Sequence, residues 1–234
     1  LHRWLGNPVL SALGKIFFSS PADDFHCGLR AFNRESIVKL DLCTKGMEFA
    51  SEMVVKATLS KLKIDQVPIT LHPDGRTRAP HLRSWRDGWR HLRFMLLYSP
   101  DWLFILPGML LFILGLIGFT ILLPKPFTVG AITFDLSSLV VFSSATLIGV
   151  QILGFGILIK IYAINSGIWP GHERWMRFAR GRSIDLGLLL GTLFLLFGLT
   201  VLFLAVADWR DAKFAALNYQ ESLRTTITAV TAIA

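Results

Sequence analysis

The chain has 234 residues, of which 53% are hydrophobic and only 17% are charged, and its mean hydropathy is +0.53. This composition is too apolar for an ordinary soluble domain. The net charge of +8 suits nucleic acid, anionic lipid headgroups or phosphorylated ligands, and the long apolar runs of the second half favour lipid. Two cysteines, Cys27 and Cys43, are too few for a disulfide framework, so we expect free thiols.

The first hundred residues have the mixed pattern of a globular domain. Apolar side chains at helical spacing predict an amphipathic helix over Leu1–Phe18. Further along, the pattern predicts a short strand at Gly28–Phe32, a short helix at Arg34–Leu40, a longer helix at Gly46–Lys63 and an edge strand at Ile64–Leu71. A piece of this size makes a poor independent core. We therefore expect it to complete a sheet whose other strands lie upstream.

The segment Arg83–Leu97 predicts a helix of a different kind. Two indoles share one helical face with leucines, and arginines flank that face. Such a pattern is typical of a helix in the membrane interface, with indoles at headgroup depth and arginines at lipid phosphates. The predicted interface residues are Trp85, Arg86, Trp89, Arg90 and Arg93. A helix packed on its own domain with a solvated basic edge is the alternative, and both can hold together.

Three runs in the second half contain no charged residue and are long enough to cross a bilayer. Each has 22 to 24 residues, and a helix needs roughly 20 to cross a hydrocarbon core of ~30 Å. The expected spans are Trp102–Leu123, Leu136–Ile159 and Leu186–Ala207, with the start of a fourth from Thr225. A soluble all-helical core is the less favoured alternative, because a buried soluble helix of this length normally keeps a polar face.

The basic residues predict the orientation of these spans. They cluster before the first span and between the second and third, whereas the other loops carry few. By the positive-inside rule both basic segments, and the soluble part with them, are expected in the cytoplasm. Within the second span, Gln151 is interpreted as a helix–helix contact rather than a substrate site, and Gly149, Gly154 and Gly156 suit close helix packing. Pro107 predicts a kink in the first span.

Two clusters in the soluble half pair carboxylates with groups that could carry chemistry. The segment from Asp23 to Arg30 could bring a carboxylate and a guanidinium together at one end of a loop. The alternative is that these carboxylates cap turns, as they usually do in a loop that contains proline. Glu48 and Glu52 lie one helical turn apart. This spacing usually reflects favourable charge near a helix N-terminus, and paired catalytic carboxylates are the alternative.

A third cluster joins a strand to arginines. Val67-Pro68-Ile69 leads through a tight turn to Arg76, whose planar fork suits a diphosphate. His26 and Cys27 are neighbours, but no second pair with ligand spacing follows, so no metal site is predicted in the chain.

In this order the three clusters resemble the second half of a membrane-anchored family 2 glycosyltransferase, of the polyprenyl-phosphate (dolichol-phosphate) mannosyl- or glucosyltransferase type. The resemblance rests on Asp-x-x-x-x-(aromatic or aliphatic)-Arg from Asp24 to Arg30 and on Gly-x-x-(Phe/Tyr)-x-x-Glu from Gly46 to Glu52. A Val-Pro-(Ile/Val) strand then ends near Arg76. The resemblance covers residues 1–100 in motif order and residues 101–234 in architecture.

The resemblance implies a fold and a reaction. The expected fold is the C-terminal half of a GT-A-like α/β domain at residues 1–80, an interfacial helix at 81–100 and an all-α transmembrane region at 101–234. The expected reaction moves a sugar from a nucleotide sugar to a polyprenyl (dolichyl or undecaprenyl) phosphate at the cytoplasmic membrane face. The protein is then an integral, multi-pass membrane protein with a cytoplasmic soluble part.

The resemblance also implies roles for individual residues. Asp24 matches the candidate catalytic carboxylate, Arg76 and Arg30 match contacts to the donor diphosphate, and Arg3 and Asn7 match the pair that meets the acceptor phosphate. The full-length enzyme is expected to need Mg²⁺ or Mn²⁺, held by ligands outside this chain, so this chain alone is expected to be inactive. Its expected partners are the donor, the acceptor and the bilayer, without nucleic acid; a homo-oligomer is left open.

A non-enzymatic membrane protein, such as a lipid flippase subunit or a scaffold, is the alternative function. Against transport, the spans contain none of the ionisable residues that coupled transporters usually need. Against a scaffold, the soluble half is larger than that role requires. A nucleic-acid binder is disfavoured because the arginines flank a membrane span.

Overall fold

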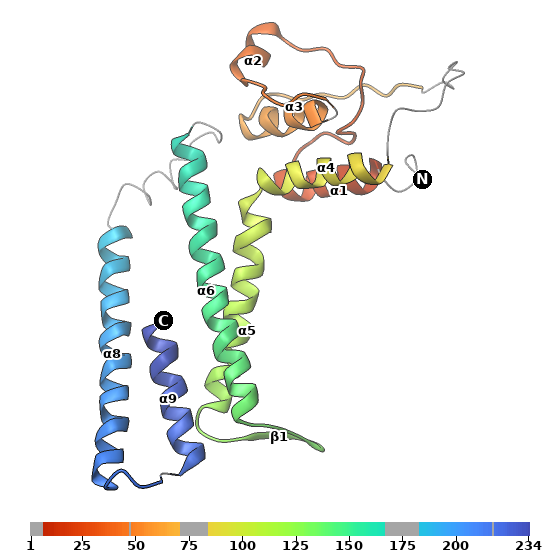
Figure 1. The fold of residues 1–234 in the computed structure, drawn as a ribbon. Helices are drawn as coiled ribbons and strands as arrows, with labels where there is room; N and C mark the ends of the chain where they lie inside the picture. Colours follow the sequence, from red (N-terminus) through yellow and green to blue (C-terminus); the bar gives the residue numbers. More distant parts are fainter. Residues whose placement is uncertain (1–6, 47, 71–83, 167–182, 217) are drawn as a thin grey trace. The chain divides into compact units, whose positions relative to one another are not determined.

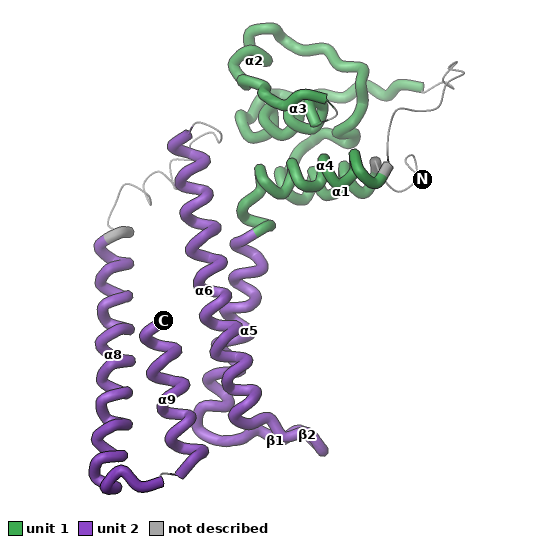
Figure 2. The backbone as a smooth tube through the Cα atoms, viewed as in Figure 1, with its two compact units in different colours: residues 1–103, 167–170 green, residues 104–166, 171–234 purple. Residues whose placement is uncertain are grey.

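The computed structural model describes all residues except 1–6, 47, 71–83, 167–182 and 217. The chain divides into two compact units (Figure 2). Unit 1 comprises Leu1–Leu103 and Gly167–Pro170, and unit 2 comprises Phe104–Ser166 and Gly171–Ala234. The described part is mostly helical, with one two-stranded sheet (Figure 1).

Unit 1 contains helices near all four predicted positions. They are α1 (Asn7–Phe18), α2 (Arg34–Lys39), α3 (Glu48–Leu59) and α4 (Ser84–Leu97). Helices α1, α3 and α4 contact one another, and the core forms between them and the loop that follows α1. The buried core residues are Phe18, Ala22, Phe25, Val54, Val55, Phe94 and Met95.

The two strands expected in unit 1 are absent from its described part. Gly28–Phe32 and residues 64–70 run without strand pairing. A strand is stable only where a neighbour pairs its N–H and C=O groups, and no such neighbour lies in the described residues of this unit. The α/β character expected for the soluble half is therefore not seen in its described residues. The second half is mostly helical, as expected, but it is not all-α, because strands β1 (Phe127–Val129) and β2 (Ile132–Phe134) pair within it.

Helix α1 buries a different face from the one that its apolar residues suggested. Ser11, Gly14 and Phe18 are buried, whereas Val9 and Ile16 are 50% and 53% exposed. A Cβ added to Gly14 would lie 2.6 Å from Cζ of Phe25. The missing side chain is therefore what lets this buried ring approach the helix.

Among the described residues, three helical stretches are long and apolar enough to cross a membrane, and they coincide with the three predicted spans. They are Asp101–Leu122, Leu136–Asn165 and Asp185–Asp211. The first combines a π-helical turn, η2 (Asp101–Ile105), with α5 (Leu106–Leu122); the others correspond to α6 (Leu136–Asn165) and α8 (Ser183–Asp211). The last helix, α9 (Tyr219–Ile233), begins before the expected start at Thr225 and packs against α8 and α6.

Helices α5 and α6 lie side by side (Figure 1), and glycines line the seam where they approach each other. A Cβ on Gly115 would lie 2.5 Å from the backbone N of Thr146, and a Cβ on Gly149 would lie 2.5 Å from the backbone N of Phe112. Side chains at these positions would collide with backbone, so glycine is required for this approach.

Of the other expectations for the spans, one is confirmed in part and one is wrong. Gly149 and Gly156 are buried in the seam as predicted, whereas a Cβ on Gly154 would meet nothing within 4 Å. Gln151 is exposed on α6 rather than buried at a helix contact. Pro107 is the second residue of α5, directly after the π-helical turn Asp101–Ile105. The kink expected there stays a prediction.

Candidate functional site

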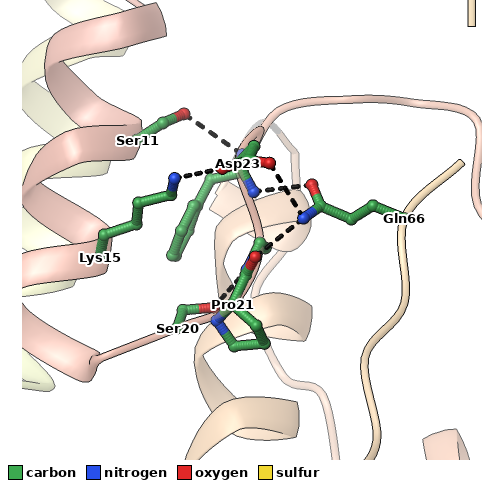
Figure 3. Close-up of polar contacts among 8 residues, drawn as sticks. Ser11, Lys15, Ser20, Pro21, Asp23 and Gln66 are labelled. Carbon is green, nitrogen blue, oxygen red and sulfur yellow. Dashed lines mark hydrogen bonds and ion pairs between the residues drawn. The ribbon is translucent and has the colours of Figure 1, made fainter. Parts of the chain in front are cut away.

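The loop between α1 and α2 is held by side chains from two other segments (Figure 3). Lys15 of α1 forms an ion pair with Asp23, which lowers the pKa of that carboxyl group. Oε1 of Gln66 accepts a hydrogen bond from Asp23 N (2.7 Å), and Nε2 of Gln66 donates to the carbonyl O of Pro21 (2.8 Å). These contacts fix the loop between α1 and the segment that follows α3.

Asp24 lies at the surface of this loop. Its Oδ1 accepts a hydrogen bond from the backbone N–H of His26 at 2.8 Å, which is the turn-capping contact expected of a carboxylate here. The next residue, Phe25, is fully buried, and its N–H donates to Oγ of Ser11 at 3.3 Å. The turn and its buried neighbour therefore position Asp24 while its carboxylate stays exposed.

Arg30 closes the same loop against α3. Its Nε donates to the carbonyl O of Cys27 (2.7 Å), Nη1 to that of Ala50 (2.8 Å) and Nη2 to that of Phe25 (2.7 Å). Burial lowers the pKa of Arg30, and the nearby negative charge of Asp24 is among the effects that oppose this shift. Asp24 and Arg30 thus lie close enough to interact electrostatically. Three of the five N–H groups of the guanidinium bind carbonyls, and its contact with a donor diphosphate stays a prediction.

Glu52, the last residue of the second motif, is fully buried. Its carboxylate accepts hydrogen bonds from Thr44 N (2.8 Å), Thr44 Oγ1 (2.6 Å) and Cys43 N (3.0 Å), and Nζ of Lys56 lies 2.8 Å from Oε1. Burial alone would raise the pKa of Glu52, but the contacts with Lys56, Thr44 and Cys43 outweigh it and lower the pKa to about 2. The carboxylate therefore joins the preceding loop to α3. These contacts, and not a favourable charge near the helix N-terminus, account for the glutamate at this position.

The sequence analysis missed a pair of histidines, of which His91 is buried and His26 is partly buried. The rings of His26 and His91 lie edge to face with centroids 4.5 Å apart, and Oγ of Ser51 lies 2.9 Å from Nδ1 of His91. Burial lowers the pKa of both rings, that of His26 to about 4, so both are neutral at pH 7. His91 follows Asp87 by four residues on the buried face of α4, and this spacing is the signal that could have identified it.

Helix α4 presents two different faces. Asp87, His91, Phe94 and Met95 are buried, and the helix contacts α1 and α3. On the other side Trp85 is 91% exposed and Trp89 is 58% exposed. The predicted arginines Arg86, Arg90 and Arg93 are exposed too, and Arg90 also pairs with Glu48 of α3 at 2.9 Å. The helix thus packs on its own unit and still displays indoles and arginines. The packed interpretation is confirmed, and the place of α4 in the membrane interface stays a prediction.

The remaining predicted site residues fall outside what the structure describes. Arg3 and Arg76 lie in residues 1–6 and 71–83, and only the backbone of Asn7 is described, at the start of α1. Among the described residues no group of three or more His, Cys, Asp or Glu side chains could hold a metal ion. Of the predicted catalytic and phosphate-binding residues, the described chain therefore brings together Asp24 and Arg30.

Comparison with known proteins gives matches over most of the chain. Residues 157–234 match the family described as the glycosyltransferase family 2 C-terminal transmembrane region. The chain is 34% identical over 218 residues to the low-salt glycan biosynthesis hexosyltransferase Agl6 of Haloferax volcanii, which covers 93% of this chain and 52% of that protein. It is 28% identical over 160 residues to the glycosyltransferase AglJ of the same organism, which covers 66% of this chain and 52% of that protein. The chain thus spans about half the length of the curated relatives it matches. No solved structure matches it.

Proposed function

Because the chain belongs to the membrane-associated glycosyltransferases of family 2, we propose that the protein transfers a sugar from a nucleotide sugar to a polyprenyl phosphate at the cytoplasmic face of the membrane. The observation that carries this proposal is the 34% identity to a hexosyltransferase over 93% of the chain. An alignment of that extent includes residues of both units. A non-enzymatic scaffold or flippase subunit gains no support from these relatives.

A lipid phosphate as acceptor is supported by helix α4. Its exposed indoles, Trp85 and Trp89, suit the headgroup region, and exposed Arg86 and Arg93 suit lipid phosphates. The helix ends at Leu97, just before the first apolar helix begins at Asp101. A soluble unit attached in this way is kept close to the headgroups, where the phosphate of a polyprenyl lipid lies. The clustering of basic residues favours the cytoplasmic side.

The proposed reaction needs little covalent chemistry from the protein. An oxygen of the lipid phosphate attacks the anomeric carbon of the sugar, and the bond to the nucleoside diphosphate breaks with its electron pair on the leaving group. Because the lipid phosphate is already an anion, the protein mainly positions it and neutralises the departing diphosphate. We assign the donor diphosphate to Arg76 and Arg30, the acceptor phosphate to Arg3 and Asn7, and the role of catalytic carboxylate to Asp24.

A divalent metal remains part of the proposal for the full-length enzyme. The described residues contain no cluster that fits such an ion, so no step is assigned to it here. Loss of transfer on chelation, with recovery on adding Mg²⁺ or Mn²⁺, tests this requirement.

The test is a transfer assay on the full-length protein in vesicles. A panel of UDP- and GDP-sugars is supplied with undecaprenyl or dolichyl phosphate, and sugar in the extractable lipid is measured. Asp24→Asn should abolish transfer without unfolding the protein, because the carboxylate is exposed. Glu35→Gln, at an exposed position on α2, is the control and should retain transfer. Full activity of the Asp24 variant removes that residue from the mechanism, and absence of lipid-linked product with every donor contradicts the proposed acceptor.

A further inference from the structure

An amphipathic hairpin joins α5 to α6 in unit 2 (Figure 1). Strands β1 (Phe127–Val129) and β2 (Ile132–Phe134) are antiparallel, and Gly130 between them has the positive φ of +60° that the tight turn requires. The register pairs Phe127 with Phe134, Thr128 with Thr133 and Val129 with Ile132. Because directly paired residues share a face and neighbours alternate, one face carries four apolar side chains and the other carries two threonines. The two hydroxyl groups lie 3.2 Å apart.

Most of the apolar face is uncovered. Phe127 is 49% exposed, Val129 is 55% exposed and Ile132 is 62% exposed, whereas Phe134 packs against a buried cluster at the ends of α5 and α6. A two-stranded hairpin is marginal in water, and large apolar side chains gathered on one face indicate a contact surface.

The base of the hairpin is held by a buried arginine of α9. Arg224 is 8% exposed and donates to the carbonyl groups of Leu122 and Leu123, just before the hairpin. The same guanidinium forms an ion pair with Asp135, just after it. One side chain thus fixes both ends of the hairpin to the helices, which restricts where its apolar face can lie.

We propose that the apolar face of this hairpin lies in the membrane interface, against lipid acyl chains, at the bilayer surface where α5 ends. The four residues between α5 and β1 reach at most ~14 Å, and a single residue separates β2 from α6. Both flanking helices belong to stretches long and apolar enough to cross a membrane. The hairpin therefore stays at the bilayer surface, where the apolar face enters the lipid and the threonine face meets water. This inference does not depend on the proposed enzymatic activity.

The test uses a fluorescent probe on each face of the hairpin. In full-length protein whose other cysteines are replaced by serine, Val129→Cys and its neighbour Thr128→Cys are labelled with NBD and reconstituted into phosphatidylcholine vesicles. We expect blue-shifted emission at position 129, quenched several-fold more strongly by acyl-chain nitroxide than the probe at position 128. Iodide in the water should show the reverse preference. Ile132→Cys and Thr133→Cys should repeat the alternation on the second strand, which also shows that labelling has not unfolded the hairpin.

Three outcomes overturn the proposal. Equal iodide quenching on both faces means that the hairpin lies in water. Loss of the alternation on both strands means that the amphipathic hairpin does not form. Quenching at position 129 that follows the protein-to-lipid ratio rather than the nitroxide content means that a second protein copy covers this face.

Discussion

A Glu52→Gln substitution removes a buried negative charge while keeping the size of the side chain. The native carboxylate is 0% exposed, binds Cys43 and Thr44 of the preceding loop, and pairs with Lys56. An amide has a single acceptor oxygen, and its NH₂ group would face donors from the loop or from Lys56. We therefore expect the loop to detach from α3.

The size of the effect follows from the pKa of the buried carboxyl group. Its contacts hold the pKa of Glu52 at about 2, against an ordinary value of 4.5. Since one pKa unit is worth ~1.4 kcal/mol, the ionised group stabilises the folded unit by about 3 kcal/mol at neutral pH. The pKa is lower in the folded state, so this stabilisation is complete above about pH 4.5 and is lost as the pH falls towards 2. Breaking a buried ion pair costs a similar free energy of unfolding, about 3–5 kcal/mol. The lower end applies here, because Lys56 keeps a hydrogen bond to the carbonyl O of Asp41 in the variant.

Hydrogen–deuterium exchange on the full-length protein measures this effect locally. A loss of about 3 kcal/mol should speed exchange at the amides of Cys43 and Thr44 by about a hundredfold. The variant should also lack the loss of unfolding free energy that the parent shows between pH 4.5 and 2. Glu35→Gln, at an exposed position on α2, is the matched control and should change neither quantity. Parental exchange rates in the Glu52 variant would mean that the buried carboxylate does not hold the loop.

Three further predictions concern other parts of the chain. Gly149→Leu should lower the unfolding temperature in detergent, because its Cβ would collide with α5, whereas Gly154→Leu on the same helix has open space and should not; equal effects contradict the glycine seam. Arg30→Lys should destabilise unit 1 by about 1–3 kcal/mol in urea unfolding, since an ammonium group cannot replace the fork that binds three carbonyls. Exposed Arg34→Lys should have little effect, and indistinguishable variants refute the assigned bonds. The neutral ring of His26 stabilises the folded unit fully above its ordinary pKa of 6.5, and this contribution is lost as the pH falls towards about 4; an NMR titration that gives a pKa near 6.5 contradicts its burial.

Local patterns in the sequence located the helices because their signals lie within the segments themselves. A charge-free run as long as a bilayer is thick leaves few alternatives to a spanning helix. The strand expected at Ile64–Leu71 failed for the opposite reason, since a strand exists only where a partner pairs with it. The buried face of α1 was missed because it depends on the fit between Gly14 and Phe25, two residues that no periodicity connects.

In the candidate site too, the sequence predicted the local contacts and missed those between residues far apart in the chain. The turn capped by Asp24 involves a residue two positions away, so the sequence predicted it. The contact of Arg30 with Ala50 and the contact of Ser51 with His91 join residues 20 and 40 positions apart. Such contacts depend on the folded packing of α3 and α4, and composition or spacing cannot specify them. The ordered motifs nevertheless identified the family, because the order of loose signals is more specific than any one of them.

The placement of Arg224 has a consequence for biogenesis. A charged side chain is unfavourable in a lipid environment, and the groups that receive this guanidinium, Asp135 and the last carbonyls of α5, belong to a stretch that the ribosome makes earlier. When α9 is synthesised, the groups that bind its arginine are therefore already present. Changes at Asp135 are therefore expected to act on the packing of α9 against α6, while leaving α5 and α6 in place.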